Sequence, residues 1–301
     1  MKHTFFKKII LFAILTIASV FVDPIFASAA TIKTYIPQNN IGAKDVFVID
    51  VIVDTQNASI NTIEGSISLL TKNNIPIEVR DLSIAGSAFS LWPKKPSLSE
   101  NGKSISFIAG APGGLIGDDV HVFKIIVSVS KPTTLQFSGN IQSYLNDGKG
   151  TSLSVKTLFT SVDVNEQKQK PVDFWNLAIS KDTVPPEPFE ITLQEDSQLY
   201  DGKKFILFNT KDTESGIDFY EIIEDLNAPV RATDAYVIVN KDFKEIKVIA
   251  HDVAGNIRVE TLSSKQSLPK ILIVSLVVVL CFIVLKRKSI YKKLVSFVKR
   301  T

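Results

Sequence analysis

The chain has 301 residues, of which 45% are hydrophobic and 22% charged, with one cysteine and a formal net charge of +3. Three of its 34 basic residues lie in residues 1–29 and eight in residues 270–301, while only one of its 31 acidic residues lies in these ends. The stretch between them therefore carries 23 basic and 30 acidic side chains. This mildly acidic surface argues against nucleic-acid binding, which needs clustered cations.

Residues 1–29 have the pattern of a signal peptide. Lys2, Lys7 and Lys8 precede an apolar stretch over residues 9–22, and Ala27-Ser28-Ala29 has the small-x-small form that signal peptidase cleaves. We predict cleavage after Ala29 or Ala30. The alternative is an uncleaved second anchor.

From Thr31 to about residue 164 the hydrophobic pattern has period two. The clearest runs lie at residues 46–53, 62–70 and 121–129, where Phe123, Ile125, Val127 and Val129 fall on one face together with His121. Clusters of Asn, Gly, Asp and Pro separate the runs. Such a sequence predicts an all-β fold in which two antiparallel sheets bury one face each.

Several stretches of this region, in their order and spacing, resemble a cohesin domain of bacterial surface proteins. The resemblance covers residues 30–164 and is carried by residues 46–54, 60–68, 86–93, 105–114 and 145–151. It implies a nine-stranded jelly-roll β-sandwich. It also implies a protein partner of the dockerin type, since cohesins bind dockerin modules in polysaccharide-degrading assemblies, and related jelly rolls bind carbohydrate.

The family's partner-selecting residues lie on a sheet face and vary too widely to be transferred one by one. From the sequence itself we single out Phe89 and Trp92, in a proline-rich stretch, as a candidate ligand loop. An exposed Trp92 would offer an aromatic platform for a ligand. A buried Trp92 would instead fill the core.

A polar linker is predicted at residues 165–184. Its Phe174-Trp175 pair could form a patch for a partner, but such a pair more often packs a linker onto a neighbouring domain. Shorter alternating runs follow in residues 185–265, where Gly255-Asn256 is typical of a hairpin turn. The motifs at residues 182–186, 215–217 and 250–256 resemble bacterial immunoglobulin-like (Ig-like) repeats, which implies a second β-sandwich that acts mainly as a spacer.

Residues 268–288 are predicted to form a single transmembrane helix. Ile271 to Leu285 contains no charged residue, and Lys286, Arg287 and Lys288 follow it at once. By the positive-inside rule the basic tail, residues 289–301, should lie in the cytoplasm and everything before the helix outside the cell membrane. The single cysteine, Cys281, falls inside this helix, so the preceding domains must fold without disulfides.

No catalytic constellation is recognisable, and we predict neither an enzyme nor a cofactor. His121 and His251 are explained more simply as structural residues than as general bases. Asp212, Glu214 and Asp218 surround Gly216, but their spacing fits no EF-hand loop, and a solvated acidic loop is favoured over a metal site.

Three functions remain open. The favoured one is a membrane-anchored surface protein whose first domain captures a dockerin-type or other protein module. The second is a polysaccharide-binding surface protein using the same sandwich. The third is a structural or adhesive envelope protein without a dedicated ligand.

Overall fold

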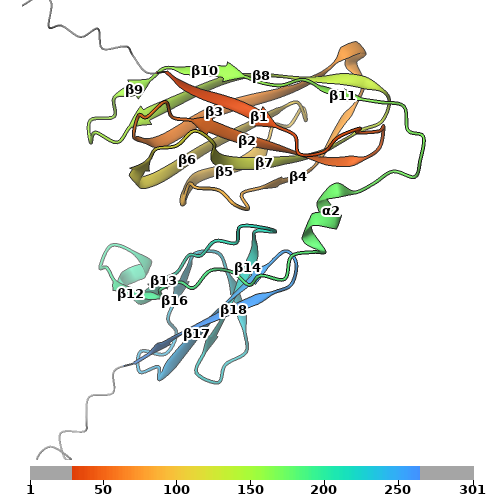
Figure 1. Ribbon diagram of the computed structural model, residues 1–301. Coiled ribbons are helices and arrows are strands. Elements are labelled where there is room, and N and C mark those ends of the chain that lie inside the picture. The colour runs from red at the N-terminus through yellow and green to blue at the C-terminus, as the bar shows by residue number, and fades with distance from the viewer. Residues whose placement is uncertain (1–28, 265–301) are drawn as a thin grey trace, which may run out of the picture. The chain divides into compact units, whose positions relative to one another are not determined.

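The computed structural model describes residues 29–264, whose regular secondary structure is almost entirely β-strand (Figure 1). They fall into two compact units. Of the described residues, 29–187, 210–218 and 250–258 form the first unit, and 188–209, 219–249 and 259–264 form the second. The transmembrane helix predicted at residues 268–288 and the signal peptide, except Ala29, lie outside the described residues. Within the described range no helix is long and apolar enough to cross a membrane.

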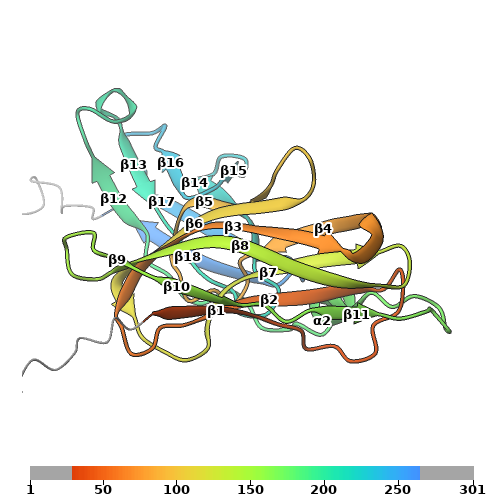
Figure 2. The same cartoon turned by 90° about the horizontal axis from the view of Figure 1, so that it is seen from above.

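The first unit contains a two-sheet β-sandwich, as the period-two pattern predicts (Figure 2). One sheet has the order β10-β1-β2-β7-β4, formed by Val155–Leu158, Ala30–Tyr35, Val46–Asp54, Val120–Val129 and Ile77–Ser83. The other has the order β11-β8-β3-β6-β5, formed by Val162–Val164, Thr133–Leu145, Ile60–Thr71, Ser104–Leu115 and Leu91–Leu98. The short strand β9 (Ser152–Leu153) pairs with β8, and a 3₁₀ turn (Lys72–Asn74) follows β3. Strands β1 and β10 of this sandwich pair in parallel, and its other paired strands described here are antiparallel.

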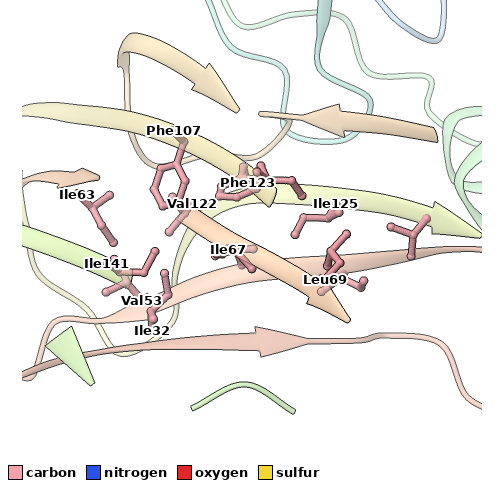
Figure 3. Close-up of a cluster of buried hydrophobic side chains, with 14 of the residues drawn as sticks. Ile32, Val53, Ile63, Ile67, Leu69, Phe107, Val122, Phe123, Ile125 and Ile141 are labelled. Atoms are coloured by element: carbon pink, nitrogen blue, oxygen red, sulfur yellow. The ribbon is translucent and has the colours of Figure 1, made fainter. Parts of the chain in front are cut away.

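The core lies between these sheets and is built from alternate residues of both (Figure 3). Ile63, Ile67 and Leu69 of β3 face Ile32, Val53 and Ile125 of the opposite sheet, and all are at most 1% exposed. Phe107 and Phe123 meet with ring centroids 4.9 Å apart. Burying each such side chain contributes about 1.5–3 kcal/mol, so the alternation accounts for the stability of the sandwich without a disulfide.

His121 departs from the predicted phase of β7. The pairing of β2 with β7 shifts between Val51 and Ile52, which places a β-bulge beside His121. As a result Val122 and Phe123 both enter the core, while the His121 side chain leaves the apolar face and bonds to Asp50. The prediction that His121 shares a face with Phe123 is therefore wrong, because one extra residue in a strand reverses the alternation beyond it.

The connector after β11 contains one short helix, α2 (Phe174–Ile179), whose N-terminus is capped by the Asp173 side chain. Trp175 is buried against Val48 and Ile126. Phe174 packs against the main core of the sandwich. The expectation that this aromatic pair packs the linker onto a neighbouring domain is thus confirmed.

The remaining strands form two small sheets. One has the order β12-β13-β16, formed by Thr192–Glu195, Lys204–Leu207 and Ala235–Val237, with a 3₁₀ turn at Tyr200–Gly202. The other has the order β15-β14-β17-β18, formed by Val230–Ala232, Ile217–Glu224, Glu245–Asp252 and Ile257–Ser263. Alternate residues of β17 are buried, and the rings of Phe208 and Tyr220 meet at 5.1 Å. The predicted turn joins β17 to β18, and Gly255 has the positive φ of 92° that favours glycine.

Candidate functional site

The outer face of the sheet β8-β3-β6-β5 is a broad polar surface. Because side chains alternate along a strand, Thr62, Glu64, Ser66 and Ser68 of β3 point away from the core residues Ile63 and Ile67. The register places partners on both sides of each of these residues. Outward side chains of neighbouring strands therefore form rows that run across the sheet, and each row consists of residues paired in register.

Three rows form the middle of this face. The first joins Tyr144, Thr62 and Gly110, the second Gln142, Glu64 and Ile108, and the third Asn140, Ser66 and Ser106. On β5, Leu91 pairs with Gly110 and Lys94 with Ile108. We call the outward residues of these rows the β3 face. Its hydroxyl and amide groups can each donate and accept hydrogen bonds.

Glu64 and Tyr144 form a short polar pair on the β3 face, while the contacts of Tyr144 with Gln142 and of Ser97 with Ser106 are longer, at 3.5 Å each. The Tyr144 hydroxyl donates to Glu64 Oε1 at 2.8 Å. This hydrogen bond, with some desolvation and the nearby carboxylate charge, raises the pKa of Tyr144 above 10.0. The phenol therefore stays protonated and holds the carboxylate in one orientation over the middle of the sheet.

Two exposed leucines lie at opposite ends of the β3 face. Leu70, near the end of β3, is 47% exposed, and Leu91, at the start of β5, is 52% exposed. An apolar side chain at each end of a polar surface offers burial to a partner that spans several strands.

The candidate ligand loop proposed from the sequence is placed differently by the structure. Phe89 is 1% exposed and belongs to the sandwich core. Trp92 lies in strand β5 and not in a loop, and it is partly buried against the same core. The two residues do not share an exposed surface, because Phe89 lies in the core before β5 begins and Trp92 packs partly against that core, whereas Leu91 and Lys94 are exposed.

The outer side of the other sheet carries a small charged cluster that sequence reasoning did not find. Asp50 Oδ1 lies 3.0 Å from His121 Nε2 and 3.0 Å from Lys124 Nζ. Burial favours a raised pKa for Asp50. The hydrogen bond with His121, the charge of Lys124 and the hydrogen bond that Lys124 donates to Asp50 together outweigh the effect of burial. The pKa of Asp50 is lowered below 3.8. The bulge beside His121 creates this cluster, and a bulge has no signature in the alternation.

Three aspartates of the first unit, Asp182, Asp212 and Asp252, form an acidic cluster. One oxygen of each lies within 4.8 Å of the others, and all three are at most 6% exposed. Asp212 Oδ1 accepts from the backbone amides of Ser215 and Gly216 at 2.8 and 2.7 Å. Carboxylate oxygens at such spacing are the kind of ligands that Ca²⁺ takes, so these are the residues that could hold a cation.

The sequence analysis considered a metal site in the same region, but with a different set of acidic residues. Of Asp212, Glu214 and Asp218, only Asp212 belongs to the cluster. The other members come from the motifs at residues 182–186 and 250–256, which were noted as Ig-like signatures and not as ligands. Asp252 Oδ1 also accepts a hydrogen bond from Asn256 N at 2.7 Å, so this side chain stabilises the turn before β18.

No family model and no curated protein matches the chain. Solved structures similar to it include cohesin modules. A non-cellulosomal cohesin from the archaeon Archaeoglobus fulgidus is 20% identical with a TM-score of 0.36, and the match covers 46% of this chain and 94% of that one. A type I cohesin from Clostridium thermocellum, solved in a cohesin–dockerin complex, is 14% identical with a TM-score of 0.35, over 46% of this chain and 95% of that one.

A third similar structure is a ScaB cohesin of R. flavefaciens in complex with a group 1 dockerin. It is 14% identical with a TM-score of 0.34, and the match covers 48% of this chain and 100% of that one. At these values the similarity concerns the arrangement of strands only. Function has to be argued from the residues of this chain.

Proposed function

We propose that this protein is a non-catalytic binding protein of the cell surface, whose β-sandwich captures a folded partner module of the dockerin type through the β3 face. The predicted transmembrane helix at residues 268–288 would hold the binding unit outside the cell. The cohesin-like order of sequence motifs between residues 30 and 164 supports the choice of partner.

The observation that carries the proposal is the composition of the β3 face. Hydroxyl, amide and carboxylate groups from several strands lie in register on one surface, with Leu70 and Leu91 exposed at its ends. A specific protein interface of ordinary size buries about 1,600 Å² in total and combines such polar contacts with a few apolar anchors. A surface that spans four strands, from β8 to β5, suits a folded module better than a small molecule, which needs a concave site.

Glu64 has the central role in this proposal. It lies between Gln142 and Ile108 in the middle row, and the Tyr144 hydroxyl fixes its position. A carboxylate held in place before the partner arrives loses little freedom on binding, so it can select a donor or a cation of the partner. Leu70 and Leu91 would supply apolar contact at either end.

A polysaccharide is less well matched to this particular face. Sugar rings stack on exposed aromatic faces, and the aromatic residue in the central rows is Tyr144, whose hydroxyl already bonds to Glu64. A row of stacking rings is not found among the outward residues of the β3 face. A purely structural role does not require a carboxylate held in place on the outer face of the sheet, as Glu64 is by Tyr144.

The proposal is tested with the full-length chain in detergent, immobilised through its C-terminus and exposed to secreted and envelope fractions of its host. The recovered partner is then titrated against two variants. Ser66→Arg places a long charged side chain in the middle of the β3 face and should weaken binding at least tenfold. Glu78→Arg, on the exposed surface of β4 in the other sheet, is the matched control.

Capture of a dockerin-type module that Ser66→Arg releases and Glu78→Arg retains would support the proposal. Equal binding by both variants would move the site away from the β3 face. Failure to recover a protein module from either fraction would favour the structural or polysaccharide alternatives.

A further inference from the structure

Tyr35, at the end of β1, lies between two hollows of the sandwich surface. One hollow of about 290 Å³ and another of about 520 Å³ share the residues Thr34, Tyr35 and Thr160 in their linings. The larger one lies within the range of about 300–1,000 Å³ typical of ligand sites. The two hollows adjoin at these shared residues, and we call them together the Tyr35 groove.

Tyr35 is unusually accessible for an aromatic residue in a strand. Its side chain is 56% exposed, and its hydroxyl makes no hydrogen bond within the part of the chain that is described. It pairs with Asp50 across β1 and β2, which places it on the outer face of the five-stranded sheet. An exposed ring with a free hydroxyl can stack on a ligand and hydrogen-bond to it at the same time.

The larger hollow has an apolar floor. Ile52, Leu158 and Phe159 line it beside Tyr35, and Leu158 is 49% exposed. Lys33 and Leu158 pair across the parallel strands β1 and β10, so the apolar side chain lies beside a polar one along the floor. This arrangement suits a ligand that has both apolar C–H faces and polar edges.

The smaller hollow is lined mainly by neutral polar groups. Asn39 and Asn40 contribute side-chain amides that bond to nothing within residues 29–264, and Thr160 and Ser161 contribute hydroxyls. An amide presents donors and an acceptor together, as does a hydroxyl, so each can match a ligand hydroxyl in either direction. The groove therefore offers hydrogen bonds without demanding a charged ligand.

The charged groups of the groove are already occupied. Lys33 Nζ lies 3.4 Å from Asp54 and 3.8 Å from Asp119, and Asp163 accepts a hydrogen bond from Thr134 at 2.8 Å. Asp50, behind Tyr35, is bound by Lys124 and His121. A charged ligand would have to compete with these pairs, whereas a neutral one would not.

We infer that the Tyr35 groove binds a neutral oligosaccharide chain, with one sugar ring stacked on Tyr35 and its neighbours extending into the two hollows. The apolar floor would contact the C–H face of a ring, and the asparagine amides would bond to ring hydroxyls. This site belongs to the five-stranded sheet and is separate from the β3 face of the other sheet. The protein could therefore hold a glycan and a partner module together.

The test is isothermal titration of the full-length chain with three neutral hexasaccharides: cellohexaose, xylohexaose and chitohexaose. The detergent must carry no sugar headgroup, so lauryldimethylamine oxide is suitable. Binding of at least one hexasaccharide is expected. Tyr35→Ala should weaken that binding at least tenfold, while Tyr35→Phe, which keeps the stacking ring, should weaken it only a few-fold. Tyr144→Ala, on the β3 face, is the matched control and should bind as the parent chain does.

Absence of binding for all three hexasaccharides at millimolar concentration would overturn the inference. So would binding that survives Tyr35→Ala, or binding that Tyr144→Ala abolishes instead. Because Tyr35 is exposed, its variants should fold, and a melting curve of each checks this. Capture of a protein partner by the β3 face is a separate measurement, so either proposal can fail without the other.

Discussion

At the scale of single residues, Asp45 shows how one buried carboxylate organises a loop and a linker. Asp45 is 4% exposed and accepts hydrogen bonds from Gly42 N, Gln167 Nε2 and Val172 N at 2.7, 2.7 and 2.8 Å. Two of these donors belong to the segment that the sequence predicts to be a polar linker. Its side chain thus fixes that segment to the entrance of β2.

Asp45→Ala should lower the free energy of unfolding by about 2–3 kcal/mol, because three donors lose their acceptor in a buried place. Urea unfolding followed by circular dichroism measures the change. Asp81→Ala is the control, since its exposed carboxylate accepts one hydrogen bond from the described part of the chain, from Leu82 N, and the substitution should cost less than about 0.5 kcal/mol. An equal effect of both substitutions would contradict the role given to Asp45.

A second residue-scale prediction concerns acid stability. The pKa of Asp50 is lowered below 3.8 because the interactions with His121 and Lys124 outweigh burial. A lowered pKa in the folded state means that Asp50 contributes stability above about pH 3.8 and loses it as the pH falls through its folded pKa. The stability difference between the parent chain and Asp50→Asn should therefore shrink from pH 7 to pH 3 in urea unfolding. A difference that stays constant with pH would contradict it.

The residues that sequence reasoning misplaced share a physical cause. Alternation predicts which face of a strand a residue occupies, but it assumes unbroken pairing, and the bulge at Val51 and Ile52 moves His121. The cluster of Asp182, Asp212 and Asp252 joins residues up to 70 positions apart, and their contact depends on how two loops meet the end of β17. Local sequence patterns predict neither the position of a bulge nor a contact between residues far apart in the chain.

At the scale of the element, β3 depends on a glycine in its middle. Gly65 has φ of 148°, and a Cβ built on it would lie 2.2 Å from the carbonyl oxygen of Asn140 on β8. The close approach of these two backbones leaves no room for a side chain. Glycine inside a strand often marks such an approach, although the sequence alone does not identify the neighbour.

Gly65→Ala should therefore push β3 and β8 apart and lower the unfolding free energy by more than about 2 kcal/mol. Gly110→Ala is a matched control on the adjacent strand β6. Its new Cβ would meet Leu91 Cβ at 3.4 Å, an ordinary contact, so the cost should stay below about 1 kcal/mol. Similar melting temperatures for the two variants would show that the approach of Asn140 is not limiting.

Strands with strong alternation were predictable, and elements with weak or mixed patterns were not. Residues 46–53 and 62–70 match β2 and β3 because every second residue enters the core. Strand β5, with two prolines and two lysines, reads as a loop, yet it completes the sheet that carries the β3 face. Helix α2 has only six residues, too few for a 3.6-residue period to show.

At the scale of the whole molecule, the proposed topology can be tested on intact cells. The basic residues Lys286, Arg287 and Lys288, with an acid-free tail after them, predict that the C-terminus stays in the cytoplasm. Protease added outside should degrade residues 30–265 and leave a short fragment that an antibody against the tail detects. Permeabilised cells, in which the fragment should disappear, are the control. Loss of the tail from intact cells would reverse the topology.

The attachment of the connector also determines how the first unit responds to mechanical load. Residues 165–173 run parallel to residues 42–46, with bridges between Gly42 and Asn165 and between Val46 and Asp173. Ala43 N donates to Asn165 O and Val46 N to Val172 O, each at 2.9 Å. A pull on the chain beyond Asp173 that is directed along these two segments would load their hydrogen bonds in shear, so that they bear it together and not one by one. Tension that passes the packed helix α2 therefore meets this pair of segments, joined at Asp45, before it reaches strand β11.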